Sequence, residues 1–113
     1  MKKYVVVKTQ FEGLHQWENC PYLSVAFLKE IHRHIFYVTV YFKVEGSDRE
    51  LEFFLMKKEI EKVISSRLAP PNLGSLSCEM MAEKIIVGMR EEGFQVYKCL
   101  VFEDNENGAE VYA

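Results

Sequence analysis

The chain has 113 residues, of which 49% are hydrophobic and 27% charged, and its formal net charge is −3. This length suits one domain with one hydrophobic core, and the composition is that of an ordinary globular protein. A negative net charge gives no basic surface for a phosphate backbone, so nucleic acid is not an expected partner. No apolar run is long enough to span a membrane, and the N-terminus leads into a strand pattern rather than the core of a signal peptide. Three cysteines without a CxxC pair favour free thiols, so we expect a cytoplasmic protein with no membrane partner.

The first part of the chain predicts two long β-strands. Residues 4–14 are rich in valine, threonine and phenylalanine, and a second run of β-branched and aromatic residues extends from about residue 32 or 33 to 45. Residues 16–24 between them predict a loop. The segment 25–31 fits either a short helical turn or the start of the second strand, and the sequence does not decide between the two.

The middle of the chain predicts a turn followed by a helix. Gly46-Ser47-Asp48 marks the turn, and residues 50–54 then fit a continued strand or the return strand of a hairpin. From Met56 to Ser66 apolar residues recur at helical spacing and charged residues cover the other side, which predicts an amphipathic helix. Proline and glycine mark residues 68–74 as a loop.

The last part of the chain predicts a second helix and two more strands. Ser77 can cap the helix and Gly93 is a suitable stop. Strands are expected over residues 94–103 and 109–112. The order strand, strand, helix, helix, strand, strand predicts a single α+β domain over residues 1–113, in which a four-stranded antiparallel sheet carries both helices on one face.

The only three histidines, His15, His32 and His34, lie at the ends of the first two predicted strands. Side chains alternate along a strand, so His15 shares a face with Val5 and Val7, and His32 and His34 share a face of the second strand. Antiparallel pairing of the two strands would bring the three imidazoles together. Three nitrogen ligands with one open position form the ligand set of a catalytic zinc site. The alternative is three ordinary half-buried histidines, but their convergence favours a metal.

Five short motifs, spread in order over nearly the whole chain, carry a family resemblance. They are Phe11-Glu12-Gly13-Leu14-His15, His32-Arg33-His34, Glu52-Phe53 with Met56-Lys57, Leu76-Ser77-Cys78-Glu79, and Phe102-Glu103 with Tyr112. In this order they resemble the F-x-A-x-H, H-G-H, D-F-x-x-L-K, P-T-x-E and E-T…Y motifs of the 6-pyruvoyl-tetrahydropterin synthase and 6-carboxy-tetrahydropterin synthase family.

The resemblance implies a T-fold unit, which closes into a homo-oligomeric ring with the active site between subunits. It implies Zn²⁺ held by His15, His32 and His34, and a pterin-type small molecule anchored by Glu103. A carboxylate can accept two hydrogen bonds from the 2-amino-4-oxo pyrimidine edge of a pterin, whereas an exposed strand-end carboxylate is the alternative for Glu103. The implied activity is that of a zinc-dependent lyase resembling 6-carboxy-tetrahydropterin synthase. Such a lyase acts on dihydroneopterin triphosphate, and its products feed the biopterin or the 7-deazaguanine (queuosine) pathway.

The chain departs from the family at the residues that transfer protons. Leu28 stands at the position of the family's catalytic cysteine, Leu68-Ala69-Pro70 lies where an Asp-His pair is expected, and Arg33 replaces the glycine of H-G-H. Proton transfer contributes roughly 10²–10⁴-fold to a rate, so this loss should cripple the usual reaction. Cys20, in the loop between the histidines, is a candidate replacement, with a packing role as its alternative. The sequence therefore leaves three interpretations: a lyase with a rearranged relay, an inactive zinc- and pterin-binding protein, and a structural ring with vestigial histidines.

Overall fold

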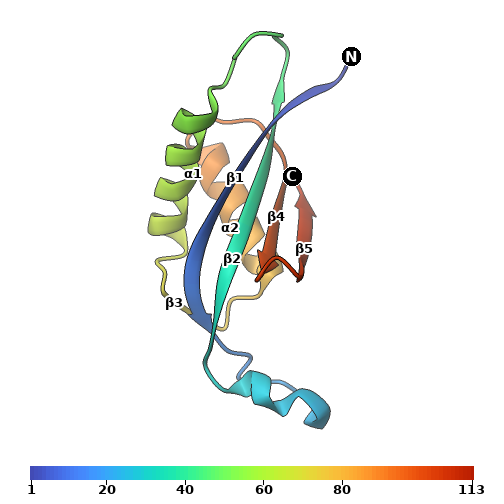
Figure 1. The fold of residues 1–113 in the computed structure, drawn as a ribbon, viewed down its shortest axis with the longest axis vertical. Helices are drawn as coiled ribbons and strands as arrows, with labels where there is room; N and C mark the ends of the chain where they lie inside the picture. Colours follow the sequence, from blue (N-terminus) through green and yellow to red (C-terminus); the bar gives the residue numbers. More distant parts are fainter.

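Two thirteen-residue strands, β1 (Lys3–His15) and β2 (His32–Val44), form the long antiparallel hairpin at the centre of the fold. The computed structural model describes residues 1–113 and gives an elongated molecule of 51 × 26 × 21 Å (Figure 1). The other elements, in chain order, are η1 (Leu23–Lys29), α1 (Phe53–Arg67), β3 (Asn72–Gly74), α2 (Cys78–Glu91), β4 (Val96–Glu103) and β5 (Asn107–Tyr112). The segment that the sequence left ambiguous is η1, a 3-10 helix that connects β1 to β2.

The sheet has five strands in the order β3-β1-β2-β4-β5, and it is mixed. The α+β class is confirmed, but the prediction of a four-stranded, purely antiparallel sheet was wrong, because β3 pairs in parallel with the end of β1. This short strand lies in the predicted loop. The Leu14 N–H donates to the Pro71 carbonyl at 2.7 Å, and the Gln16 N–H donates to the Gly74 carbonyl at 2.9 Å. Leu73 between them is buried, so core packing holds β3 in place.

Gly13 makes this close approach of β3 possible. A Cβ atom at Gly13 would lie 2.5 Å from Cδ1 of Leu73 and 2.9 Å from the ring of Phe36. The missing side chain therefore leaves the space that Leu73 fills beside Phe36, directly beneath the histidine-bearing ends of β1 and β2.

Both helices lie behind the sheet in Figure 1, and the core fills the space between. Its largest fully buried side chains include Phe36 and Phe42 from β2, Ile60 from α1, and Met81 and Met89 from α2. The sheet face that carries the histidines is therefore the covered face.

The start of α1 corrects a second prediction. Residues 50–54 are not a strand, because the Glu52 carboxylate accepts hydrogen bonds from the backbone N–H groups of Phe54 and Leu55 and so caps a helix that begins at Phe53. The cap of α2 is the predicted one, with the Ser77 hydroxyl accepting from the Met80 N–H at 3.1 Å.

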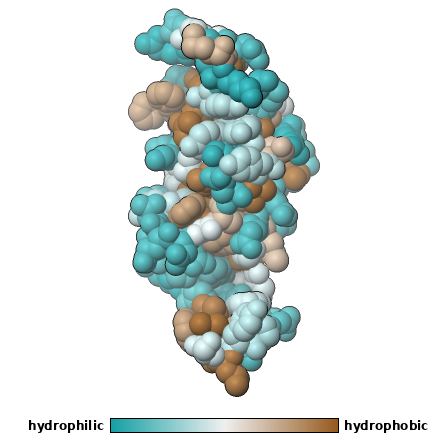
Figure 2. All heavy atoms as spheres, turned by 90° about the vertical axis from the view of Figure 1, so that its right-hand side faces the viewer, coloured by the Kyte–Doolittle hydropathy of each residue, from teal (hydrophilic) through white to brown (hydrophobic).

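Two regions of the fold leave apolar side chains or strand edges without partners. Along its outer edge, β1 pairs only at Leu14 and His15, through β3. The helix η1 projects past the end of the sheet and contains no buried residue, and Leu23 and Phe27 on it are 92% and 67% exposed. Figure 2 shows apolar side chains gathered at this end of the molecule. None of the helices is both long and apolar enough to cross a membrane.

Candidate metal centre

The three histidines meet where β1 and β2 end. In the register of the hairpin His15 lies opposite His32, and His34 lies opposite Gly13, so all three side chains emerge on the covered face. The imidazole centroids are 4.6 Å apart for His15 and His32, 5.4 Å for His15 and His34, and 5.0 Å for His32 and His34. One nitrogen from each ring lies within 4.8 Å of the others. The predicted convergence is thus confirmed, and the three histidines lie close enough together that they could hold a metal ion.

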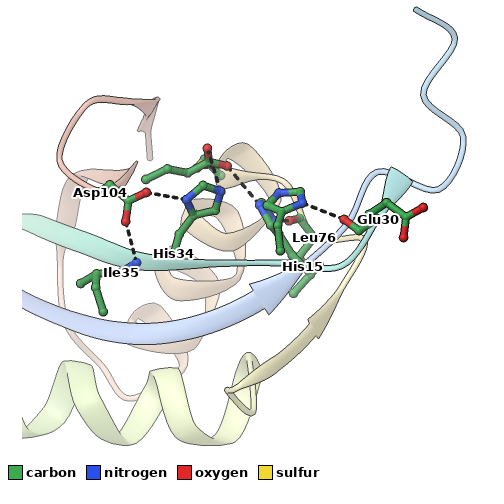
Figure 3. A network of polar contacts seen from close by, with 9 residues as sticks. His15, Glu30, His34, Ile35, Leu76 and Asp104 are labelled. Carbon is green, nitrogen blue, oxygen red and sulfur yellow. Dashed lines mark hydrogen bonds and ion pairs between the residues drawn. The ribbon is translucent and has the colours of Figure 1, made fainter. Parts of the chain in front are cut away.

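Backbone carbonyls fix the orientation of His15 and His32. Nδ1 of His15 lies 2.9 Å from the carbonyl oxygen of Leu76, and Nδ1 of His32 lies 2.8 Å from the carbonyl oxygen of Glu30. A carbonyl oxygen can only accept a hydrogen bond, so each Nδ1 carries the proton and donates it. Figure 3 shows the labelled His15 beside Leu76.

A carboxylate performs the same task for His34. Its Nδ1 donates to Oδ2 of Asp104 at 2.6 Å, and the other carboxylate oxygen accepts from the Ile35 N–H at 2.9 Å (Figure 3). Asp104 sits in the β4–β5 turn with a φ of 49°, a left-handed conformation that Asp and Asn adopt more readily than most residues. The hydrogen bonds from His34 and Ile35 hold the pKa of Asp104 below its usual value, so this side chain is an anionic acceptor.

These three contacts leave Nε2 of every histidine as a lone-pair donor. Metal-binding histidines usually donate their other ring N–H to a carboxylate or backbone carbonyl, which fixes the ring and the tautomer. The arrangement around His15, His32 and His34 has this form for each ring. Burial of His15, which is 8% exposed, lowers the pKa of its imidazole, although the Leu76 carbonyl and the negative charge of Glu103 act in the opposite direction.

Glu103, the last residue of β4, places its carboxylate over the histidines. Its Oε1 lies 3.2 Å from Nε2 of His15, and its Oε2 lies 3.6 Å from Nε2 of His34. The Cys78 thiol, at the start of α2, donates weakly to Oε1 at 3.9 Å. Glu103, which the resemblance assigned to substrate binding, therefore lies beside the imidazoles and is not an isolated carboxylate in solvent.

A pocket of about 420 Å³ opens beside His15, His32 and Glu103. Its other lining residues come from the loop after β1, from η1, from the start of α2 and from the start of β5: Gln16, Trp17, Leu28, Ser75, Leu76, Ser77, Cys78, Glu79, Met80, Asn107 and Gly108. The histidine cluster thus has a cavity in which a small molecule could reach it.

Of Cys20, Cys78 and Arg33, only Cys78 lines the pocket. Cys20 is buried and absent from the pocket lining, since its thiol faces the carbonyls of Tyr22 and Val25 at 3.7 and 3.8 Å. Cys78 lines the pocket, and burial raises the pKa of its thiol to about 12, with further contributions from nearby carboxylates. Arg33 lies on the other face of β2 from His32 and His34 and forms an ion pair with Glu12 at 2.9 Å.

Sequence reasoning missed Asp104 and the backbone acceptors of the site. Asp104 lies between the strands predicted over residues 94–103 and 109–112, and the carbonyls of Leu76 and Glu30 cannot be identified from residue type. The signal available for Asp104 was its position directly after Glu103, because a residue next to a proposed site carboxylate is also near the histidines.

Comparisons with known proteins give a fold and no family. No protein-family model matches the chain, and no curated protein matches it. Among solved structures, the chain is similar to an uncharacterized protein from Wolinella succinogenes, with a TM-score of 0.73 and 12% sequence identity over 99% of this chain and 98% of that one. At this identity the similarity establishes a shared fold only.

Proposed function

We propose that this protein binds zinc through His15, His32 and His34 and acts as a zinc-dependent lyase on a pterin, in the manner of 6-carboxy-tetrahydropterin synthase. The observation that supports the metal is the set of three Nδ1–H donors, each held by its own acceptor, which leaves a free Nε2 on each of three histidines that lie close together. Imidazole nitrogen suits zinc, and a catalytic zinc site commonly has three protein ligands.

Each of the three histidines is held by a hydrogen-bond acceptor on its Nδ1. His15 and His32 are held by main-chain carbonyls, and His34 by the carboxylate of Asp104. When bound, zinc supplies a Lewis acid that polarises an oxygen of the substrate and eases removal of a neighbouring proton. The protein's own contribution is to hold the imidazoles in one tautomer and to present the substrate from the adjoining pocket.

The pocket supports a pterin as the substrate class. Its volume of about 420 Å³ lies within the roughly 300–1,000 Å³ typical of small-molecule sites. Trp17 gives one wall an aromatic surface, and the Glu103 carboxylate can accept paired N–H donors such as those of the pterin pyrimidine edge. The choice of a pterin comes from the resemblance of the surrounding motifs to the tetrahydropterin synthase family. The pocket adds a compatible volume and a compatible lining.

The altered proton relay favours a second candidate function, a zinc- and pterin-binding protein without turnover. Leu28, at the position of the family's catalytic cysteine, lines the pocket and can neither donate nor accept a proton. Cys20 is buried away from the pocket. With its pKa raised to about 12, the Cys78 thiol stays protonated at neutral pH and is a poor base.

We also propose that the protein forms a homo-oligomer with its sites near the subunit boundaries. The outer edge of β1 is unpaired over most of its length, and exposed strand edges readily pair with another chain. The apolar side chains of η1 and of the first turn of α1, including Leu23, Phe27 and Phe54, are exposed in the single chain. Because η1 also contributes Leu28 to the pocket, a contact through η1 would place a second subunit beside the site.

Two measurements test the proposed function in order. Elemental analysis of untagged protein should find about one zinc per chain, and His32→Ala should lose it while remaining folded; absence of zinc from the parent protein would refute the proposal. Turnover of dihydroneopterin triphosphate by zinc-loaded protein would then establish the lyase. Tight pterin binding, measured by quenching of Trp17 fluorescence, without turnover would establish the second candidate instead.

A further inference from the structure

The Glu103 carboxylate faces Nε2 of His15 and of His34 at distances that suit a cation shared between them. The Nδ1 atoms of His15 and His34 carry protons because each donates to an oxygen acceptor, so their Nε2 atoms present lone pairs. Oxygens of Glu103 lie 3.2 and 3.6 Å from these two lone pairs. Two acceptors at this separation repel each other unless a proton or a metal ion lies between them.

The distances match those between ligands of one metal ion. In a tetrahedral zinc site with bonds of about 2.0–2.1 Å, neighbouring ligand atoms are about 3.3 Å apart. The two oxygen–nitrogen distances of Glu103, 3.2 and 3.6 Å, lie on either side of this value. A carboxylate oxygen is a normal zinc ligand, so the chemistry of the donor agrees with the spacing.

The backbone holds Glu103 in this position. Glu103 pairs with Phe36 of β2 on one side and with Asn107 of β5 on the other, so the end of β4 is fixed between two strands. Phe36 also packs against the rings of His15 and His34, with centroid separations of 5.2 and 5.7 Å. Phe36 of β2 therefore contacts both the backbone that carries the Glu103 carboxylate and the imidazoles of His15 and His34.

We infer that Glu103 is the fourth ligand of the bound metal in the protein without substrate, so that three imidazoles and one carboxylate close the resting site. This inference rests on the proposed binding of metal by the three histidines. It gives Glu103 two roles that exclude each other, because a carboxylate that ligates the metal cannot at the same time accept both N–H groups of a pterin edge. When the substrate binds, the Glu103 carboxylate must then leave the metal and bind the pterin instead.

Cobalt substitution tests this assignment without any measurement of activity. Untagged protein is stripped with a chelator and titrated with Co²⁺, whose visible spectrum reports the number and kind of its ligands. Glu103→Gln should change the Co²⁺ spectrum and weaken Zn²⁺ binding at least as much as loss of an outer-shell partner does, which is roughly 10–100-fold. The matched control is Glu106→Gln, the same chemical change at an exposed turn residue that touches none of the histidines; it should leave spectrum and affinity unchanged.

The outcomes separate this inference from the proposal beneath it. If the parent protein binds Co²⁺ and Zn²⁺ in stoichiometric amounts and Glu103→Gln matches it in spectrum and affinity, the fourth-ligand assignment is overturned and the three-histidine site stands. If the parent protein binds neither ion in stoichiometric amounts, both fall. A changed spectrum together with weakened binding in Glu103→Gln alone establishes the assignment.

Discussion

The proposed zinc site predicts that His32→Ala abolishes any thermal stabilisation of this protein by zinc. His32 is the most suitable of the three ligands to remove, because His15 is buried and its loss would leave a cavity. The His32 side chain donates a hydrogen bond to the Glu30 carbonyl at an exposed position. Its loss should cost the metal-free protein about 1 kcal/mol or less, so the variant should fold.

The expected size of the zinc effect follows from linkage and chain length. Zinc at 100 times its dissociation constant stabilises the folded state by about 2.7 kcal/mol. An unfolding entropy of roughly 2.1 cal/mol/K per residue gives about 240 cal/mol/K for the 113 residues. The melting temperature of the parent protein should therefore rise by about 11 °C on zinc addition, whereas that of His32→Ala should stay constant.

Scanning calorimetry of untagged protein, with zinc and with a chelator, measures both shifts. Lys29→Ala serves as the control, because Lys29 is an exposed residue of η1 close to His32 in sequence and should keep the full shift. The chain has only three histidines, so no other imidazole can supply a competing site. A full zinc-dependent shift in His32→Ala would refute the reasoning.

Four further predictions concern the support of the site, its protonation, the core and the assembly. Asp104→Asn, which tolerates the left-handed backbone but removes the negative charge behind His34, should weaken zinc binding roughly tenfold or more in a chelator competition; an unchanged dissociation constant would show that the carboxylate is dispensable. Metal binding needs neutral imidazoles, so zinc should be released as the pH falls below about 6.5. Zinc retained in full at pH 4 would contradict this prediction. Burial also lowers the pKa of His15, so the unfolded chain binds a proton at this residue more readily than the folded chain does. The stability that this group gives to the metal-free protein should therefore be present above about pH 6.5 and decline below it. Phe36→Ala, at a fully buried position, should lower the free energy of unfolding by about 3–5 kcal/mol in urea titrations, and a loss under 1 kcal/mol would argue against its central place. Leu23→Asp should shift the light-scattering mass toward the monomer while zinc binding persists, and a strictly monomeric parent protein would remove the basis for the proposed oligomer.

The elements with strong local signals were predictable from the sequence. The two long strands and α2 carry clear patterns, β-branched runs in the former and a capping serine in the latter, and they form close to the predicted residues. The strand β3 has no such signal, because it is three residues long and exists through the packing of Leu73 into the gap at Gly13. Apolar periodicity began α1 only at Met56, because Glu52, which supplies the cap, is not a typical capping residue.

The site was predictable to the extent that strand alternation determines it. Alternation and hairpin pairing were sufficient to bring His15, His32 and His34 together, since neither depends on remote contacts. The cysteines show the limit of this reasoning. Cys20 is near His15 in sequence, yet its thiol turns into its own loop, whereas Cys78 is remote in sequence and reaches the pocket because the cap at Ser77 positions the start of α2 there.

Two of the three acceptors behind the imidazoles are main-chain oxygens, those of Glu30 and Leu76. A main-chain oxygen persists through any side-chain replacement that preserves the local path of the backbone. The positions flanking the histidines are consequently free to diverge, and natural variants at residues 30 and 76 should bind metal as the parent does. Sequence motifs around the histidines can therefore change while the orientation of the imidazoles is kept. Proteins with this fold are better compared by the groups that contact their imidazoles than by their sequence motifs.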